Sequence, residues 1–157
     1  MEELISLLKN RKETVATMES CTGGMLASEI TNIAGSSDVF HCSLVTYSSA
    51  YKVKFGVKQE TINTYTVYST QTADEMAKVI TSVADADWGI GITGYLGDVD
   101  PDGILEGKNI VYYSIYNRKE EKIKAYILEI PNHLKNRKEK KEYIIRDVIE
   151  KFKKQLH

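Results

Sequence analysis

The stretch TVATMESCTGG, at residues 14–24, decides the predicted fold together with the segment that follows it at residues 25–33. Residues 14–18 are apolar or β-branched, which is typical of a strand, and residues 25–33 carry apolar side chains at helical spacing. The small residues between them predict a tight turn that leads into a helix. The first N–H groups of a helix carry partial positive charge, so an anion can approach this turn closely.

Ser20 lies in this turn and is the first candidate for a catalytic nucleophile, because its hydroxyl would lie beside the helix N-terminus. The alternative is that Ser20 or Thr22 only caps the helix. Cys21 is another candidate nucleophile, since thiols at helix N-termini are acidified, but a small buried residue is the preferred interpretation of this position.

The composition is that of a globular protein. The 157 residues, 42% hydrophobic and 27% charged, predict one domain over residues 1–157 that folds without disulfides. No apolar run approaches the roughly 20 residues that a membrane span needs, and residues 1–3 lack the basic start of a secretory signal. We therefore expect a cytoplasmic protein with no membrane partner. The only cysteines, Cys21 and Cys42, lack metal-type spacing and are expected to be free thiols.

Helical and alternating apolar patterns continue along the chain. Helices are predicted at 2–10, 25–33, 50–55, 69–83 and from Pro131 to the end, and strands at 14–18, 39–46, 88–92, 109–116 and 122–130. Residues 59–68 fit neither pattern clearly. Strands that alternate with helices predict a layered α/β domain, and the late hairpin predicts a mixed sheet. Gly89 and Gly91 predict close packing against a neighbouring backbone.

Three predicted strands end in hydroxyl-bearing or glycine residues, at 20–24, 47–52 and 93–97. Strands that point the same way place their carboxyl ends at one edge of a sheet, where the functional crevice of such folds lies. One crevice could therefore collect all three segments.

A serine nucleophile needs a base, and Lys52 is the best-placed candidate in the sequence. The three histidines are poorly placed, because His41 lies within a predicted strand, His133 follows Pro131 and His157 is terminal. A lysine becomes a competent base when burial or nearby positive charge lowers its pKa. The alternative is a surface lysine beside a packed tyrosine, Tyr47.

Five motifs occur in order: Glu19-Ser20-Cys21-Thr22-Gly23-Gly24, Gly35-Ser36-Ser37, Tyr47-Ser48 with Lys52, Ser69 with Thr72-Ala73 and Met76-Ala77, and Thr93-Gly94 with Gly97. Together they resemble the CinA C-terminal domain family, which includes the PncC nicotinamide-nucleotide amidohydrolases. The resemblance covers roughly residues 5–156. It implies a single three-layer α/β/α domain with a mixed, mostly parallel sheet, often as a homodimer.

The resemblance also implies an activity, the hydrolysis of nicotinamide mononucleotide to nicotinic acid mononucleotide and ammonia, without a metal or a cofactor. By position, Ser20 would be the nucleophile, Lys52 its base and Tyr47 a hydroxyl that relays or orients the proton. The residues expected to bind the substrate are Cys21, Thr22, Gly23, Gly24, Thr93, Gly94 and Arg137. N–H donors of residues 21–24 would stabilise the oxyanion, and Arg137 with the loop at 93–94 would bind the phosphate.

The chain departs from the family pattern at Ser49, at Gln71 and in the Asp-rich segment 98–103. Asp98, Asp100 and Asp102 match the first half of a calcium loop, but the second half of that motif is missing, so a solvated acidic loop is preferred. The chain also lacks the larger N-terminal domain of CinA proteins, which predicts a stand-alone form.

One alternative function is a catalytically weak CinA-like binding or interaction protein that engages a nucleotide or nucleic acid through its basic last helix. Residues 132–157 contain nine Lys and Arg residues and four acidic residues, although the net charge of the chain is −1. A charged outer face of an amphipathic helix is the commoner explanation of such a segment, so a nucleic-acid partner is not expected.

Overall fold

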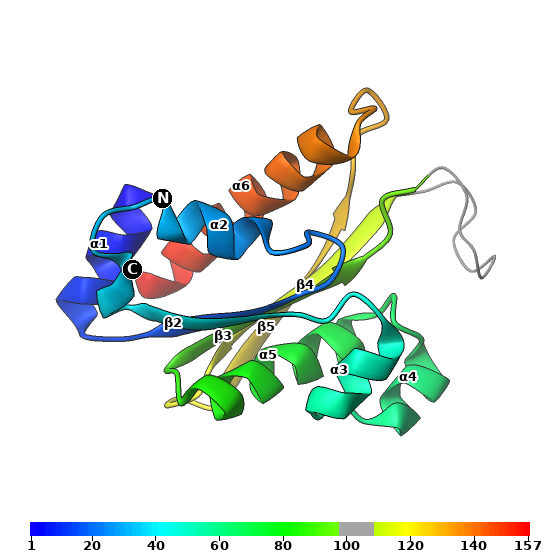
Figure 1. Ribbon diagram of the computed structural model, residues 1–157, viewed down its shortest axis with the longest axis horizontal. Helices are drawn as coiled ribbons and strands as arrows, with labels where there is room; N and C mark the ends of the chain where they lie inside the picture. The colour runs from blue at the N-terminus through cyan, green and yellow to red at the C-terminus, as the bar shows by residue number, and fades with distance from the viewer. Residues whose placement is uncertain (98–108) are drawn as a thin grey trace.

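Five strands form one mixed sheet in the order β2-β1-β3-β4-β5 in the computed structural model, which describes residues 1–97 and 109–157 (Figure 1). The strands are β1 (Val15–Glu19), β2 (Phe40–Val45), β3 (Trp88–Gly94), β4 (Ile110–Asn117) and β5 (Lys122–Glu129). β1 pairs in parallel with β2 and β3, whereas β4 is antiparallel to both β3 and β5. Four strands therefore run in one direction, which confirms the mixed sheet.

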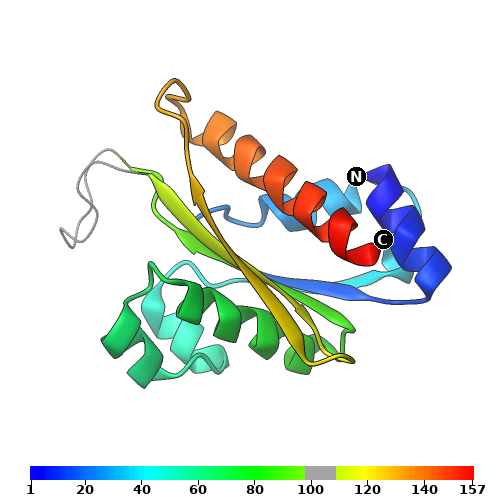
Figure 2. The ribbon, with the colours of Figure 1, turned by 180° about the vertical axis from the view of Figure 1, so that it is seen from behind.

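Helices cover both faces of this sheet, as Figures 1 and 2 show. One face carries α1 (Glu2–Arg11), α2 (Met25–Thr31) and α6 (Arg137–Leu156), and the other carries α3 (Ser49–Phe55), α4 (Gln59–Tyr65) and α5 (Thr70–Ala84). A short 3-10 helix, η1 (Ser36–Asp38), precedes β2. The three-layer α/β/α architecture is confirmed.

The structure adds one helix to the sequence prediction and moves the start of another. Within the segment 59–68, which the sequence pattern left open, residues 59–65 form α4. The last helix does not begin near Pro131 but at Arg137, because the Asn136 side chain caps it by accepting a hydrogen bond of 2.8 Å from the Glu139 N–H.

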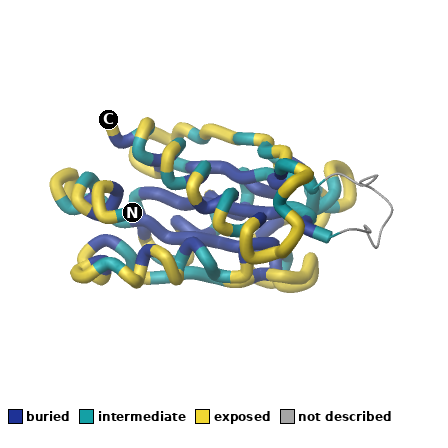
Figure 3. The backbone as a smooth tube through the Cα atoms, turned by 90° about the horizontal axis from the view of Figure 1, so that it is seen from above, coloured by how far each residue is buried: buried dark blue, intermediate teal, exposed yellow. Residues whose placement is uncertain are grey.

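Each face of the sheet buries its own apolar cluster, so the central strands β1, β3 and β4 are largely buried, whereas the edge strands β2 and β5 and the outer faces of the helices are more exposed (Figure 3). The larger cluster joins the apolar stripes of α1, α2 and α6, with Leu8, Ile30 and Phe152 fully buried. The smaller cluster packs α5 against β1 through Met18, Met76 and Ile80. None of the helices within residues 1–97 and 109–157 is both long and apolar enough to cross a membrane.

Gly89 and Gly91 lie where α5 packs directly on β3, as the sequence predicted. A Cβ atom at Gly91 would lie 2.6 Å from the backbone nitrogen of Ala77 and 2.8 Å from the Cβ of Met76. These distances are too short for non-bonded atoms, so any side chain at this position forces the helix away from the strand.

We expect Gly91→Ala to lower the free energy of unfolding by about 1–3 kcal/mol, because it overpacks this contact. Urea unfolding of the purified variant measures the change. The control is Ser82→Ala at an exposed position on α5, which should stay within about 0.5 kcal/mol of wild type. Equal stability of Gly91→Ala and wild type would contradict the close helix–strand contact.

Candidate active site

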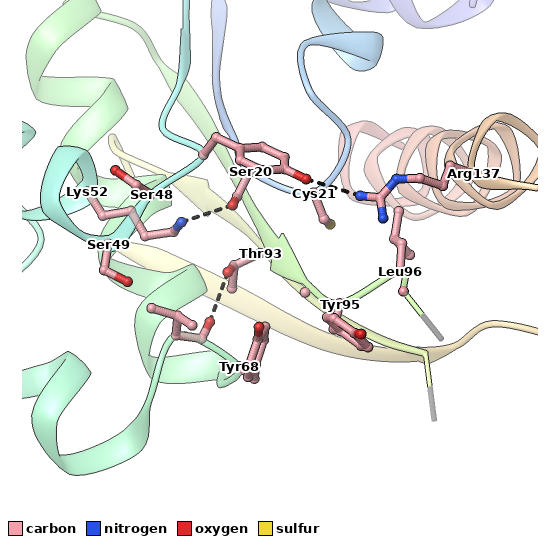
Figure 4. Close-up of a pocket in the computed structure, with 14 residues that line it drawn as sticks. Ser20, Cys21, Ser48, Ser49, Lys52, Tyr68, Thr93, Tyr95, Leu96 and Arg137 are labelled. Carbon is pink, nitrogen blue, oxygen red and sulfur yellow. Dashed lines mark hydrogen bonds between the residues drawn. The ribbon is translucent and has the colours of Figure 1, made fainter. Parts of the chain in front are cut away.

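A cleft of about 540 Å³ lies where β1, β2 and β3 end (Figure 4). Its walls come from Ser20 and Cys21, from residues 47–49 and Lys52, from residues 67–68 and 93–97, and from Arg137. The three strand ends that the sequence predicted to share a crevice therefore do so. The first residue of α6 and the segment before α5 complete the walls.

Ser20 and Lys52 are in direct contact in this cleft. The Lys52 Nζ donates hydrogen bonds to the Ser20 Oγ at 2.9 Å and to the carbonyl oxygen of Thr46 at 2.8 Å. Lys52 is only 2% exposed and Ser20 only 6% exposed. The structure therefore excludes the alternative of a surface lysine.

Burial changes the protonation of Lys52. Loss of solvent around the amine lowers the pKa of Lys52 from 10.5 to about 8. Both acceptors of its hydrogen bonds, a hydroxyl and a carbonyl, are uncharged. A substantial fraction of Lys52 is therefore a neutral amine near pH 8, which is the state that a general base requires.

Lys52 reaches Ser20 because α3 begins soon after β2, with only residues 46–48 between them. Ser48 caps this helix, and its side chain accepts a hydrogen bond from the Tyr51 N–H at 3.4 Å. Lys52 follows one turn later on the face that points toward the sheet. The five-residue spacing from Tyr47 to Lys52 thus results from a cap and one helical turn.

The buried carboxylate of Glu19 occupies the N-terminus of α2. It accepts hydrogen bonds from Thr22 Oγ1 at 2.6 Å, from the N–H groups of Gly24 and Leu26 at 3.2 Å each, and from the Ala27 N–H at 2.9 Å. The N-cap residue itself is Gly24, without a side-chain cap. Neither Ser20 nor Thr22 caps the helix, which corrects that interpretation.

The hydrogen bonds of Glu19 also correct the predicted oxyanion donors. The Gly24 N–H is bound to Glu19, and the Gly23 N–H donates to the carbonyl oxygen of Ser20 at 3.0 Å. Thr22 is buried, with its hydroxyl on Glu19. Of residues 21–24, Cys21 is the one that lines the described part of the cleft, so its backbone N–H is the remaining candidate.

Cys21 is unsuited to be the nucleophile. It is 3% exposed, and burial raises the pKa of its thiol to about 12. The thiolate is therefore disfavoured at neutral pH, which supports the interpretation of Cys21 as a small buried residue. Both Cys21 and Cys42 are free, as predicted.

Tyr47 lies at the rim of the cleft rather than on the reactive pair. Its side chain is exposed, and its hydroxyl accepts a hydrogen bond from Arg137 Nη2 at 3.1 Å. The structure thus joins two predicted site residues that are far apart in the sequence. It does not show the predicted contact of Tyr47 with Ser20 or Lys52.

Thr93 and Gly94 line the cleft, but both serve the protein framework. The Thr93 hydroxyl donates to the carbonyl oxygen of Val67 at 2.8 Å and so fastens the segment that precedes α5 (Figure 4). A Cβ atom on Gly94 would lie 2.7 Å from the carbonyl oxygen of Ile110, so this glycine allows β3 to approach β4. These two framework interactions do not support the predicted contact of Thr93 and Gly94 with a phosphate.

The sequence interpretation missed Tyr68, and it placed Tyr95 only as a member of the segment 93–97, without a role of its own. Both line the cleft, and their ring centroids are 6.1 Å apart with an edge-to-face angle of 72°. Tyr95 follows the recognised Thr93-Gly94 motif, which was the only local signal for it. Tyr68 follows Val67, whose carbonyl oxygen accepts the hydrogen bond from Thr93.

Lys140 also departs from the prediction of a solvated basic face on the last helix. It is buried, and its Nζ donates to Asn109 Oδ1 at 2.7 Å and to the carbonyl oxygen of Leu96 at 3.4 Å. The Asn109 side chain in turn donates to the carbonyl oxygen of Gly97 at 2.8 Å. Lys140 therefore fixes the chain on which Tyr95 lies.

Asp98, Asp100 and Asp102, the residues of the calcium hypothesis, lie outside the described residues. Within residues 1–97 and 109–157, no group of three His, Cys, Asp or Glu side chains could hold a metal ion. Of the two single departures from the family pattern, Ser49 lines the cleft, whereas Gln71 is exposed on α5.

Comparison with known proteins agrees with this fold. The model of the CinA C-terminal domain matches residues 1–155. A CinA-like protein of Kosmotoga olearia is 42% identical over 118 residues, which are 73% of this chain and 28% of that protein. The curated relatives that we compared are much longer, and the match spans between 24% and 31% of their length.

Solved structures show the same likeness over nearly the whole chain. The CinA superfamily protein of Klebsiella pneumoniae has a TM-score of 0.88 and 25% identity, covering 99% of this chain and 94% of that one. A competence or damage-inducible protein of Enterobacter asburiae also has a TM-score of 0.88, with 26% identity and coverage of 99% and 98%. From its residues, its fold and these matches, the chain belongs to the CinA C-terminal domain family.

Proposed function

We propose that this protein hydrolyses the carboxamide of nicotinamide mononucleotide, giving nicotinic acid mononucleotide and ammonia. The observation that carries the proposal is the buried pair of Lys52 and Ser20, 2.9 Å apart, with the pKa of Lys52 lowered to about 8. Such a pair activates a hydroxyl for attack on an amide carbonyl carbon. The proposed substrate follows from the resemblance to the nicotinamide-nucleotide amidohydrolases.

In the first half of the reaction, the neutral amine of Lys52 takes the proton of Ser20 while Oγ bonds to the carboxamide carbon. The electron pair of the C=O bond moves onto oxygen, and the Cys21 N–H is the candidate donor to that oxyanion. When the C=O bond forms again, the C–N bond breaks. The leaving nitrogen takes the proton from the Lys52 ammonium and departs as ammonia, which leaves an ester on Ser20.

In the second half, water attacks the ester carbon and gives its proton to Lys52. The C–Oγ bond then breaks, and Lys52 returns the proton to Ser20 Oγ, which restores the pair. The hydrogen bond from Nζ to the carbonyl oxygen of Thr46, at 2.8 Å, keeps the amine in place in both protonation states. Lys52 therefore serves as base and then as acid in each half.

Arg137 is the candidate partner of the substrate phosphate. Its guanidinium lies at the open rim of the cleft, where the Tyr47 hydroxyl accepts a hydrogen bond from it at 3.1 Å. A guanidinium presents several N–H donors in a plane, so it can keep this bond and still bind a phosphate oxygen. Tyr47 is then a residue that orients Arg137.

The test is ammonia release from nicotinamide mononucleotide by the wild type and by Ser20→Ala. We expect release by the wild type and a loss of at least about a thousandfold in the variant, since the nucleophile is removed. The matched control is Ser49→Ala, another serine of the cleft, which should lose less than about tenfold.

Two outcomes would contradict the proposal in different ways. No ammonia from the wild type at high enzyme concentration would reject the amidase activity, and binding of the nucleotide without turnover would favour the catalytically weak alternative. Ammonia release that survives Ser20→Ala would reject the serine mechanism alone.

A further inference from the structure

We propose that Lys140 is a positioning residue, which holds Arg137 where the phosphate of the bound nucleotide meets it. The buried amine of Lys140 fastens the first turn of α6 to the chain beside β3 and β4, and this turn begins with Arg137. The inference rests on the proposed function, in which Arg137 binds the phosphate. Lys140 does not line the described part of the cleft, so it acts on the substrate through Arg137.

The start of α6 is exposed as far as Lys140. Residues 135–139, which include Arg137, are all exposed, whereas Lys140 is only 6% exposed and is the first buried residue of the helix. The next buried residue, Ile144, lies one turn further along. Lys140 is therefore the buried contact of α6 that lies nearest to Arg137.

Lys140 is also the one charged residue in the buried stripe of α6. The other buried side chains of this helix, from Ile144 to Leu156, are apolar and belong to the larger core cluster. The Lys140 amine instead donates to Asn109 Oδ1 at 2.7 Å and to the carbonyl oxygen of Leu96 at 3.4 Å, and a buried lysine needs such acceptors. A hydrogen bond fixes direction as well as distance, so it holds the helix start in one position.

The acceptors of Lys140 lie on a rigid part of the sheet. The backbone carbonyl oxygen of Asn109 accepts a hydrogen bond from the Ile130 N–H at 2.9 Å, and its side chain donates to the carbonyl oxygen of Gly97 at 2.8 Å. The Tyr95 N–H donates to the carbonyl oxygen of Ile110 at 3.1 Å. These bonds continue the pairing of β3 with β4 beyond the end of β3, so Lys140 joins α6 to a fixed support.

Both ends of this connection belong to the cleft. Leu96 and Arg137 line it, and Figure 4 shows them on the side opposite Lys52. In the proposed reaction the carboxamide lies at the Ser20–Lys52 pair while the phosphate binds Arg137. One molecule thus spans a separation that the protein sets in advance, and release of the helix start would let Arg137 move away from the phosphate.

The experiment is a double-mutant cycle between Lys140 and Arg137, with binding of nicotinamide mononucleotide measured by calorimetry. All proteins carry Ser20→Ala, which prevents turnover. We expect Arg137→Ala to weaken binding by about tenfold to a hundredfold, because the phosphate loses a charged hydrogen-bond donor. Lys140→Met should weaken binding by about tenfold when Arg137 is present and by less than about twofold in Arg137→Ala.

Two further variants complete the cycle. Lys138→Met removes one positive charge from the same turn at an exposed position, and it should weaken binding by less than about twofold. Asn109→Ala removes the acceptor on the sheet, so its effect should depend on Arg137 in the same way as that of Lys140→Met. Urea unfolding shows whether each variant is folded, and Asn109→Ala carries the test if Lys140→Met does not fold.

Equal weakening by Lys140→Met with and without Arg137 would overturn the inference, because the effect would not pass through Arg137. Equal weakening by Lys138→Met and Lys140→Met would also overturn it, by assigning the effect to charge alone. Unchanged binding in Lys140→Met or in Arg137→Ala, or no binding by the parent, would reject it as well. The expected cycle without ammonia release by the wild type would keep the role of Lys140 and reject the hydrolysis, whereas ammonia release without this coupling would do the reverse.

Discussion

Lys52→Met is expected to lower kcat for ammonia release by about a hundredfold to ten-thousandfold, the range that general-base catalysis supplies. Methionine has a similar length and apolar character, so it fills the space of the lysine stem without its amine. The matched control is Lys54→Met on the same helix, where the lysine is exposed, and its activity should equal that of wild type. Similar losses in both variants would contradict the assignment of Lys52 as the base.

The same substitution should stabilise the protein, which distinguishes a catalytic lysine from a structural one. The pKa of Lys52 is lower in the folded protein, about 8, than its ordinary value of 10.5. The unfolded chain therefore binds more protons between these values, and below about pH 8 the buried ammonium costs up to about 3 kcal/mol. Methionine removes this cost but leaves the two acceptors of the amine unpaired, which offsets part of it. We therefore expect a net rise in the free energy of unfolding of about 1–2 kcal/mol at neutral pH.

The lowered pKa of Lys52 fixes the direction in which activity and stability change with pH. For wild type, kcat/KM is expected to rise as pH increases through about 8 and then to level off, because the neutral amine is the active base. The free energy of unfolding should rise between about pH 8 and pH 10.5 through the deprotonation of Lys52. In Lys52→Met this contribution to stability should be absent, and urea unfolding at several pH values measures it. A contribution of the same size in both proteins would contradict the lowered pKa.

Glu19→Ala is expected to lower the free energy of unfolding by about 3–4 kcal/mol, because it leaves several buried or partly buried donors without an acceptor. These donors are the Thr22 hydroxyl and the N–H groups of Gly24, Leu26 and Ala27. Activity should fall too, since the turn that carries Ser20 loses its anchor. Urea unfolding and the ammonia assay on one preparation measure both effects.

Two further variants sharpen the Glu19 prediction. Glu29→Ala removes an exposed carboxylate from the same helix, α2, and should change stability by no more than about 0.5 kcal/mol. Glu19→Gln keeps the shape and one carbonyl acceptor, so its loss should lie between those of the two alanine variants. A Glu19→Ala variant as stable as Glu29→Ala would show that the carboxylate does not hold the helix start.

The periodicity of the sequence was enough to predict most of the fold. Runs such as residues 14–18 and 88–92 are locally consistent with one type of element, so apolar spacing and turn residues locate them within a few positions. Residues 59–68 were ambiguous because α4 buries none of its residues completely, and a half-exposed helix has no clear apolar stripe. The start of α6 was missed because a side-chain cap at Asn136, not Pro131, begins it.

The sequence by itself also determined which segments carry the site, since strand ends that face one edge of a sheet can be recognised from their order. It could not determine what each side chain contacts. Glu19 and Ser20 are neighbours in the chain, but strand alternation sends them to opposite faces of the sheet, Glu19 to α2 and Ser20 to Lys52. Only the layers that cover those faces decided that one carboxylate anchors a helix and one hydroxyl meets a base.

Contacts over long separations were likewise decided by the tertiary structure. Arg137 lies 90 residues from Tyr47, and Tyr68 precedes α5 whereas Tyr95 follows β3. Local patterns report whether a position is apolar or polar, whereas the partner of a polar side chain depends on which elements the sheet brings together. The sequence therefore determined the strands, the turn and the Ser20–Lys52 hypothesis, and the packing of three layers decided the geometry that gives these residues their chemistry.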